Sequence, residues 1–384
     1  MRENKTVAVL GATGSVGTQA LDIARRRKHR VEILTANNNI ALIEKYSREF
    51  LPRYAVLADE GAAAELRIRL RDTDVKVLAG KAGILEALAE SKIDAAVNAI
   101  TGFSGLEPTL AVLDKGARLC LANKESLVVA GDVVMKRAKE KSAEIIPVDS
   151  EHSAIFQSAK SGGKIKRIFL TASGGPFRGM SREQLSHVSV EDTLRHPTWK
   201  MGKRITVDSA TLMNKGFEVI EAVHLFDVCA KNIEVIIHPQ SILHSAVEYA
   251  DNAVIAQLSQ PDMRLSIQYA LDYPDRASAT VEPLDFVKLG SLTFSAPDSE
   301  AFPLLSLAYR AAEDGGAMGA VLNAADEVAT AAFLSGEIPF NVITDTVFQT
   351  YESLLYAREL NSLDDIRAAD SLARQTALDI IARK

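Results

Sequence analysis

Cysteine and tryptophan are scarce in this chain, which has two cysteines and one tryptophan among 384 residues. Cys120 and Cys229 lie far apart, each beside apolar residues, so we expect two buried, inert thiols and no disulfide framework. This cysteine usage favours a reducing compartment, the cytoplasm. The chain starts M-R-E-N-K-T and runs directly into a strand-like segment, so neither a signal peptide nor a transit segment is expected.

Long apolar runs and blocks of like charge are also lacking. No run approaches the roughly 20 apolar residues of a membrane-spanning helix. The net charge of −6 comes from interspersed acids and bases, which argues against a nucleic-acid surface and against a polybasic membrane patch. Any phosphate site must therefore be local. The length exceeds the roughly 250 to 300 residues at which a single core stops growing, so two or three domains are expected.

The first 148 residues alternate short apolar runs with helical patterns, which predicts a doubly wound, Rossmann-like parallel sheet. The turn after the first strand reads G-A-T-G-S-V-G, residues 11–17. Glycines there permit a tight turn and let a pyrophosphate approach backbone amides at a helix N-terminus, so nucleotide binding is predicted. We expect strands at 6–10, 31–35, 54–57, 75–78, 95–98, 118–121 and 144–148, and a first helix that ends near Arg27.

The turn after the second strand bears on the choice of nucleotide. An acid there would hold the adenosine ribose of NAD, but Thr35 and Ala36 are followed by Asn37, Asn38 and Asn39. NADP is therefore preferred over NAD. The turn has no Arg or Lys, so the 2′-phosphate must be contacted by asparagine amides, by backbone N–H groups or by a base elsewhere in the chain.

Two carboxylates, Asp149 and Glu151, follow an apolar run in the segment P-V-D-S-E-H. On an extended backbone they would point the same way. At about 4 Å and an effective dielectric near 20 they would repel by about 4 kcal/mol, which a divalent, oxygen-binding cation would relieve. The alternative is that both acids simply start a helix at Ser150, where negative charge suits the helix dipole.

Two further segments have both a functional and an ordinary interpretation. Asn123 and Lys124 follow the strand at 118–121, where ligands bind in parallel sheets, although they also suit a polar helix start. The stretch 173–204 is polar and irregular and carries the only tryptophan, Trp199, which indicates either a lid or a packed loop.

Residues 207–221 are predicted to form one helix with Asp208 as its N-cap. Its polar stripe places Lys215 beside Glu218, either as a working face or as a surface ion pair worth a few tenths of a kcal/mol. Asn214 and Gly216 are unfavourable inside a helix, a local cost that indicates a working face.

The remainder of the chain predicts a mixed second sheet and a helical end. Strands are expected at 166–172, 235–237, 245–249 and 254–258. His238 and His244 lack a third metal-ligand partner and are interpreted as structural. The predicted domains are a nucleotide-binding domain at 1–148, a catalytic domain at 149–273 with its lid at about 173–204, a linker at 274–300 and a C-terminal helical bundle at 301–384.

Six motifs, in this order, resemble the 1-deoxy-D-xylulose 5-phosphate reductoisomerase family over nearly the whole chain: G-A-T-G-S-V-G, L-A-N-K-E-S-L, P-V-D-S-E-H, T-A-S-G-G-P-F, R-H-P-T-W-K-M-G and V-D-S-A-T-L-M-N-K-G-F-E-V-I-E. That family converts 1-deoxy-D-xylulose 5-phosphate to 2-C-methyl-D-erythritol 4-phosphate in the non-mevalonate isoprenoid pathway. The resemblance implies NADPH, Mg²⁺ or Mn²⁺ as cofactors and a homodimer through the second domain. The alternatives are a metal-independent NADP-dependent dehydrogenase of a small phosphorylated substrate, and a nucleotide-sensing protein without catalysis.

The resemblance also implies roles for individual residues. The metal ligands would be Asp149, Glu151 and Glu218. The substrate would be bound by Lys124, Ser150, Glu151, Ser173, His196, Ser209, Asn214, Lys215 and Glu218, of which Lys124, Glu151, His196 and Glu218 would be catalytic. NADPH would be lined by Thr13, Gly14, Ser15, Val16, Asn123, Glu125 and Gly202, together with the asparagines at 37–39. Relatives often carry Lys or Arg where this chain has Asn38, so we expect this chain to differ from the family in how strongly it recognises the 2′-phosphate.

Overall fold

The computed structural model describes residues 4–195, 201–355 and 362–383. The chain folds into two compact units, each assembled from segments that are not consecutive in sequence. Unit 1 contains Met1–Asn123, Val134–Ser153 and Asp262–Glu282, and unit 2 contains Lys124–Val133, Ala154–Pro261 and Pro283–Lys384. The segments of the two compact units therefore alternate along the chain. The consecutive domains expected from the sequence, each with its own function, stay a prediction.

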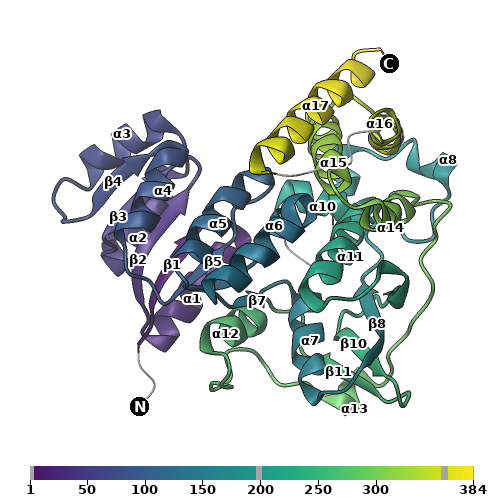
Figure 1. Cartoon of the computed structure of the whole chain (residues 1–384), viewed down its shortest axis with the longest axis horizontal. Helices are drawn as coiled ribbons and strands as arrows, with labels where there is room; N and C mark the ends of the chain where they lie inside the picture. Colours follow the sequence, from purple (N-terminus) through teal and green to yellow (C-terminus); the bar gives the residue numbers. More distant parts are fainter. Residues whose placement is uncertain (1–3, 196–200, 356–361, 384) are drawn as a thin grey trace. The chain divides into compact units, whose positions relative to one another are not determined.

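Unit 1 is built on the seven-stranded parallel sheet that the alternating pattern predicts (Figure 1). Its strand order is β4-β3-β2-β1-β5-β6-β7, so the order reverses between β1 and β5. The predicted strand positions are confirmed to within one or two residues. The strands are β1 (Thr6–Leu10), β2 (Arg30–Ala36), β3 (Tyr54–Leu57), β4 (Lys76–Ala79), β5 (Ala95–Asn98), β6 (Arg118–Leu121) and β7 (Ile145–Pro147).

Helices of unit 1 follow the strands, as expected for a doubly wound sheet. They are α1 (Ser15–Arg27), α2 (Ile40–Phe50), α3 (Glu60–Arg69), α4 (Gly80–Glu90) and α5 (Leu106–Asp114), with a short 3-10 turn η1 (Phe103–Gly105) before α5. Two more helices, α6 (Glu125–Lys141) and α7 (Ser150–Ser158), contribute residues to both units.

A helix from much later in the chain, α12 (Arg264–Asp272), completes unit 1 by packing against α1, β6 and β7. Its last residue, Asp272, lies 3.0 Å from the guanidinium of Arg27. The guanidinium of Arg118 donates to the carbonyl oxygen of Tyr273 at 2.7 Å.

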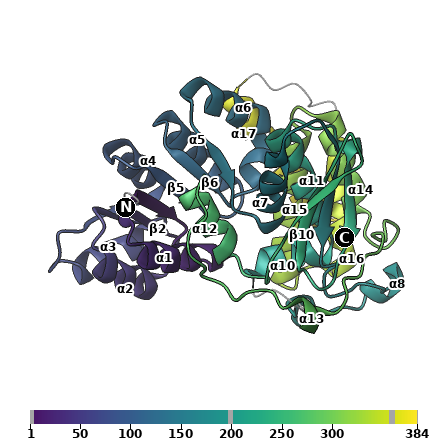
Figure 2. The ribbon, with the colours of Figure 1, turned by 90° about the horizontal axis from the view of Figure 1, so that it is seen from below.

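Unit 2 contains a four-stranded mixed sheet of order β11-β10-β8-β9, in which only β8 and β9 are parallel. Figure 2 shows this sheet and the helices of the same unit from below. The strands are β8 (Ile165–Ala172), β9 (Ile233–Ile237), β10 (Leu243–Tyr249) and β11 (Val254–Leu258). The helices are α8 (Arg182–Leu185), α9 (Val190–Thr193), α10 (Lys203–Ala210), α11 (Met213–Phe226), α13 (Phe286–Leu289), α14 (Leu304–Asp314), α15 (Met318–Leu334), α16 (Phe340–Ser353) and α17 (Leu363–Ile381), with 3-10 turns η2 (Ala159–Ser161) and η3 (Ala230–Asn232).

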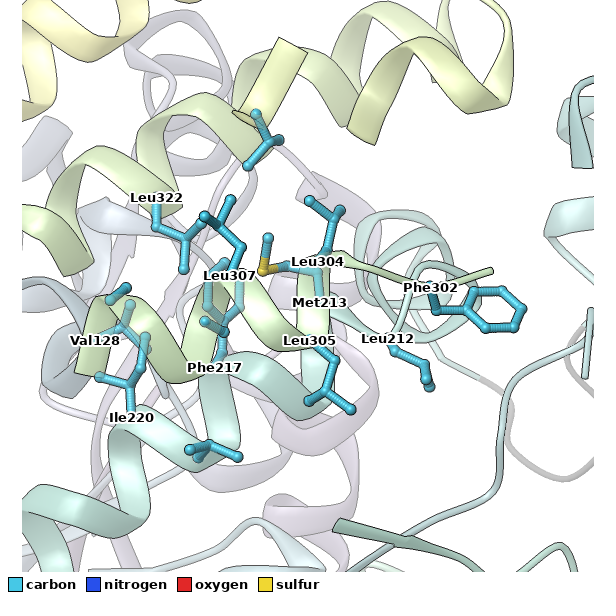
Figure 3. Packing of buried hydrophobic residues seen from close by; sticks show 14 of the residues in the cluster. Val128, Leu212, Met213, Phe217, Ile220, Phe302, Leu304, Leu305, Leu307 and Leu322 are labelled. Atoms are coloured by element: carbon cyan, nitrogen blue, oxygen red, sulfur yellow. The ribbon is translucent and has the colours of Figure 1, made fainter. Parts of the chain in front are cut away.

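Helix α11 lies at the centre of the unit 2 core. Figure 3 shows Met213 and Phe217 of α11 gathered with Leu304 and Leu307 of α14, all nearly inaccessible to solvent. A Cβ added at Gly216 would lie 2.5 Å from the Cβ of Ala308 on α14. Gly216 therefore serves close helix packing, and the interpretation of this glycine as a sign of a working face was wrong.

The single helix expected at 207–221 is also wrong, because the chain forms two helices with a break between them. Asp208 lies inside α10 rather than at an N-cap, and Leu212 adopts a left-handed conformation with φ of 60°. This conformation costs a non-glycine residue roughly 1–2 kcal/mol, and the Leu212 side chain offsets it by its burial in the core. No glycine marks the break, so the sequence does not reveal it.

The described part of the stretch 173–204 is more ordered than its composition indicates. Two short helices, α8 and α9, each begin with a capping box, formed by Ser181 with Gln184 and by Ser189 with Asp192. The ring of Phe177 packs edge-on against that of Phe340 on α16, so this part of the stretch is fixed to the helical region.

Two compositional expectations are tested directly. Cys120 is buried, and burial raises the pKa of its thiol to about 12, whereas Cys229 is exposed, so only one of the two thiols is buried as expected. Across the residues with described positions, no helix combines the length and the apolar character that crossing a membrane requires.

Candidate functional site

The glycine-rich turn after β1 has the geometry of a nucleotide-phosphate cradle. A Cβ added at Gly17 would lie 2.1 Å from the carbonyl oxygen of Gly11, so α1 can start this close to the turn only with glycine at that position. Gly14 is the N-cap of α1, and Gly14 and Ser15 are exposed at the helix start beside Thr13 and Val16. A helix N-terminus presented in this way suits a pyrophosphate group.

The turn lies at the point where the strand order of unit 1 reverses. Gly11 has φ of 84°, and a Cβ there would lie 2.5 Å from the carbonyl oxygen of Ala99, directly after β5. Asn123, directly after β6, is buried and donates through its side chain to the carbonyl oxygen of Gly102 at 3.0 Å. The loops after β1, β5 and β6 thus meet where dinucleotides bind in such sheets.

The three asparagines after β2 are exposed, but they are not equivalent. Asn39 is the N-cap of α2, and its side-chain oxygen accepts from the backbone N–H of Leu42 at 3.1 Å. No cap of this kind occupies the side-chain oxygens of Asn37 and Asn38. Asn39 therefore has a structural role as a helix cap that is not described for Asn37 and Asn38.

The paired acids after β7 occupy a helix start and not an extended strand. The carbonyl oxygen of Asp149 accepts from the N–H of Ser153, which marks Asp149 as the residue before α7, and Glu151 lies in the first turn. The hydroxyl of Ser150 donates to a Glu151 carboxylate oxygen at 2.6 Å. The expected extended geometry is wrong here, whereas the expected helix start at Ser150 is confirmed.

Four predicted site residues come together within unit 2. The ammonium group of Lys124 donates to the Asn214 side-chain oxygen at 2.8 Å and to a Glu218 carboxylate oxygen at 3.1 Å. Asn214 donates to that same oxygen at 2.6 Å, and Lys215 pairs with the other one. Lys215 is 4% exposed and Glu218 is 1% exposed, so the surface ion pair is wrong, whereas the working face stays a prediction.

The group brings two ammonium groups to one carboxylate in a buried place. Buried ionised groups are tolerated when they are paired and hydrogen-bonded, as these are.

Ser173 and Ser209, two residues predicted to bind the substrate phosphate, both contact Gly175 in the turn after β8. The Ser173 hydroxyl oxygen accepts from the backbone N–H of Gly175 at 3.3 Å. Gly175 has φ of 67°, and a Cβ there would lie 2.6 Å from the Ser209 carbonyl oxygen. The glycine thus lets the turn lie directly against α10. Gly202 is the N-cap of α10, whereas His196 lies outside the described residues, as does Trp199.

The two histidines of the second domain are structural, as expected. The ring of His238 accepts from the backbone N–H groups of Ile242 and Leu243 at 3.1 and 3.2 Å, and its other nitrogen bonds the carbonyl oxygen of Thr293. His244 bonds the hydroxyl of Ser259 at 2.8 Å, and burial lowers its pKa to about 4.

The sequence analysis missed one cluster of charged residues, because it predicted no functional residues in the C-terminal helices. Asp326 and Glu327 of α15 face Arg204 of α10 at 3.7 and 2.9 Å. The available signal was the spacing of Asn323, Asp326 and Glu327, which forms a polar stripe at i, i+3 and i+4 on an otherwise apolar, alanine-rich helix.

Taken together, the sheet order and the glycine cradle define a dinucleotide-binding α/β protein, and unit 2 adds a buried polar site. The family models for the 1-deoxy-D-xylulose 5-phosphate reductoisomerase, for its C-terminal domain and for the DXP reductoisomerase C-terminal domain match residues 7–131, 145–226 and 258–376. The chain belongs to the 1-deoxy-D-xylulose 5-phosphate reductoisomerase family.

Relatives of the same description match almost the whole chain. The protein of Caldanaerobacter subterraneus subsp. tengcongensis is 51% identical, over 97% of this chain and 98% of its own. That of Bacteroides fragilis is 45% identical, over 99% of both chains. The solved reductoisomerase of Zymomonas mobilis in complex with NADPH is 41% identical, covers 99% of both chains and has a TM-score of 0.91. A reductoisomerase structure with NADPH, fosmidomycin and magnesium is 39% identical, covers 98% of both chains and has a TM-score of 0.94.

Proposed function

We propose that this chain catalyses the NADPH- and divalent-metal-dependent isomerisation and reduction of 1-deoxy-D-xylulose 5-phosphate to 2-C-methyl-D-erythritol 4-phosphate, a step of the non-mevalonate isoprenoid pathway. The observation that carries the proposal is the buried group of Lys124, Asn214, Lys215 and Glu218, in a chain that matches reductoisomerases over its full length. A metal-independent dehydrogenase would not need these four residues in addition to the acids Asp149 and Glu151.

The metal ion, Mg²⁺ or Mn²⁺, would be held by Asp149, Glu151 and Glu218. All three are carboxylates, the donor type that hard divalent cations bind. When bound, the ion supplies Lewis-acid polarisation of a carbonyl or hydroxyl oxygen. A second set, Asp149, His152 and Glu221, contains a nitrogen donor, which suits magnesium less well.

NADPH would occupy the cradle of unit 1, with Thr13, Gly14, Ser15 and Val16 at its phosphates. Gly11 and Gly17 let the backbone around the turn pack more closely than any Cβ would allow, which gives the tight turn that a dinucleotide site requires. When bound, NADPH supplies the hydride for the reduction. Asn123, Glu125 and Gly202 would line the remainder of this site, with Asn37, Asn38 and Asn39 towards the adenosine end.

Residues of the chain itself would bind and orient the substrate. Lys215, Asn214, Ser173 and Ser209 would hold its phosphate, because the lysine supplies charge and the others supply donors at the end of the β8 turn and along α10 and α11. Lys124 would stabilise negative charge that develops on a substrate oxygen. Ser150 would contact a substrate hydroxyl, and His196 would close over the substrate with the lid to exclude water.

A turnover assay tests the function. The chain is incubated with 1-deoxy-D-xylulose 5-phosphate and NADPH, with and without Mg²⁺ or Mn²⁺, and the loss of NADPH absorbance is followed. We expect turnover that a chelator abolishes and added metal restores. Turnover that persists after chelation would favour the metal-independent dehydrogenase, and nucleotide binding without turnover would favour a nucleotide sensor.

Cofactor preference gives a separate prediction. Replacing Asn38 by Asp places a negative charge where the 2′-phosphate is expected, so kcat/KM with NADPH should fall by about tenfold, while kcat/KM with NADH changes little. The control is Asn38→Ala, which removes the same amide without adding a negative charge and should lower kcat/KM with NADPH much less. Steady-state kinetics with both nucleotides give the comparison, and a wild-type chain that already prefers NADH would contradict the interpretation.

We also propose a homodimer formed through unit 2. Strand β11 lies at the edge of its sheet, and Val254 and Ile255 on it are exposed apolar residues. Phe286 and Val287, in the later segment of the same unit, are exposed too. An apolar edge strand is normally covered by another chain. Sedimentation should show a dimer that Ile255→Lys weakens, whereas Leu51→Lys, at an exposed leucine of unit 1, should leave it intact.

The location that we propose is the cytoplasm. Cys229 is an exposed free thiol, and a thiol of this kind persists in reducing compartments. The experiment is fractionation of cells that express the chain, with the activity expected in the cytoplasmic fraction.

A further inference from the structure

Arg204, near the start of α10, is surrounded by acids from three helices. Its guanidinium lies 3.2 Å from Glu125 on α6, 3.7 Å from Asp208 on α10, and 3.7 and 2.9 Å from Asp326 and Glu327 on α15. We call these five residues the Arg204 cluster. All of them belong to unit 2.

The cluster contains more negative than positive groups. Outside it, Arg374 of α17 bonds Glu327 at 2.6 Å and Asp370 at 2.7 Å, so two guanidinium groups face five carboxyl groups. Asn323 is the neutral member of this surrounding layer, accepting from Arg204 and donating to Glu327. Lys124 is the remaining cation whose charge acts on Asp208. Such an excess of buried carboxyl groups favours retention of a proton.

The geometry identifies where the proton resides. Asp326 is fully buried, and neither of its side-chain oxygens accepts a hydrogen bond. One oxygen of Asp208 also accepts none. A buried carboxylate without donors is costly, whereas a protonated carboxyl group can donate to a neighbouring carboxylate. Burial and the neighbouring acid raise the pKa of Asp326 well above its usual value, and burial raises that of Asp208 to about 6.

The cluster is joined to the substrate site through the backbone. Glu125 directly follows Lys124, which bonds Asn214 and Glu218. Asp208 directly precedes Ser209, against which the Gly175 turn packs. A shift of Glu125 or Asp208 therefore moves a residue that binds substrate, although no member of the cluster has to contact the substrate.

We infer that Arg204 is a positioning residue for the reaction, which fixes Lys124 through Glu125 and Ser209 through Asp208, and that Asp208 and Asp326 share one proton behind it. The inference rests on the proposed function for its catalytic consequence. The shared proton does not depend on the proposed function, because it is inferred only from the residues of the Arg204 cluster.

The catalytic part is tested with Arg204→Met and Arg204→Lys in the full chain. Misplacement of Lys124 and Ser209 should lower kcat/KM of Arg204→Met by roughly ten- to a hundredfold and raise the KM for 1-deoxy-D-xylulose 5-phosphate. Arg204→Lys keeps the charge and should recover part of the loss. The matched control is Arg310→Met, which removes an exposed arginine that pairs with Asp314 and Glu352 on the helices of the same unit.

A purely structural Arg204 would give a different pattern. In that case Arg204→Met would lower Tm, yet kcat and KM per folded molecule would equal those of the wild type, and this result would overturn the positioning role. A wild-type chain without turnover would instead count against the proposed function. The two failures are therefore distinguishable.

The shared proton is tested without substrate, by measuring Tm against pH for the wild type and for Asp326→Asn. A carboxyl group whose pKa is raised by folding stabilises fully below its unfolded pKa and loses that contribution as pH rises through the folded pKa. The wild-type Tm should therefore fall as pH rises from about 4, near the pKa of an unfolded aspartate, towards about 6 for Asp208. The fall should continue to higher pH for Asp326, whose pKa is raised well above its usual value. Asp326→Asn imitates the protonated group and should flatten this fall. Equal slopes for the two proteins from pH 4 to 9 would overturn the shared proton.

Discussion

Glu218→Gln should lower kcat by on the order of a hundredfold at limiting Mg²⁺, because it removes one anionic ligand from the proposed metal site. The affinity for NADPH should stay near that of the wild type, since the nucleotide cradle lies in unit 1 and Glu218 in unit 2. Excess metal should recover part of the rate, because mass action offsets weaker binding without restoring the lost ligand. Metal-dependent kinetics, together with NADPH and Mn²⁺ titrations of the same variant, measure all three effects.

The matched control is Glu221→Gln. Glu221 lies on the same helix and, like Glu218, is 1% exposed, so both changes remove one carboxylate from a buried position of α11. We expect Glu218→Gln to weaken Mn²⁺ binding much more than Glu221→Gln does. The reverse order would assign the ion to Asp149, His152 and Glu221 instead. Near-normal turnover of Glu218→Gln at limiting metal would remove Glu218 from the site.

Gly17→Ala is expected to have the second large effect. The added Cβ would lie 2.1 Å from the Gly11 carbonyl oxygen and 2.7 Å from the Ala12 Cα, both of them backbone atoms that cannot rotate away. Relief requires α1 to move off the turn, so unit 1 should lose about 3 kcal/mol of stability, at the upper end of the cost of overpacking. NADPH affinity should fall at least tenfold, because the start of α1 leaves the phosphate position.

Thermal unfolding and a fluorescence titration with NADPH measure the two consequences of Gly17→Ala. Gly61→Ala in α3 is the control, since its Cβ would meet only the Asp59 side chain, at 3.3 Å, and alanine favours a helix by up to about 1 kcal/mol over glycine. We expect no loss of stability or of NADPH affinity in that variant. A Gly17→Ala protein that binds NADPH normally would show that close approach of α1 is not needed for the cofactor.

The nucleotide cradle and the sheet of unit 1 were predictable because their signals are local. Strand β1, the glycines at 11 and 17 and the start of α1 lie within a single short segment, and each has a direct geometric requirement. The stripe that joins Lys215 to Glu218 was predictable for the same reason, since helical periodicity extends over only a few residues. The burial of that stripe was not, because it depends on packing by segments far away in the sequence.

The features that escaped prediction all depend on contacts between distant residues. Gly216 is required by Ala308 on α14, and the left-handed Leu212 is compensated by a core that α14 helps to form. The role of Asp326 and Glu327 is apparent only in the folded chain, where α15 packs so that both acids lie next to Arg204. Nothing in the local composition of these segments specifies such partners.

Because α12 belongs to unit 1 but lies late in the sequence, it constrains the order in which the protein can fold during translation. During translation the seven strands leave the ribosome long before Asp272 and Tyr273, yet Arg27 and Arg118 depend on these two residues for their contacts. Domains generally fold as units while the chain emerges from its N-terminal end. Nascent unit 1 therefore stays incomplete, with the α12-binding surface of α1, β6 and β7 uncovered, until about half of unit 2 has been made. A chaperone that binds nascent chains would find that surface exposed during this interval.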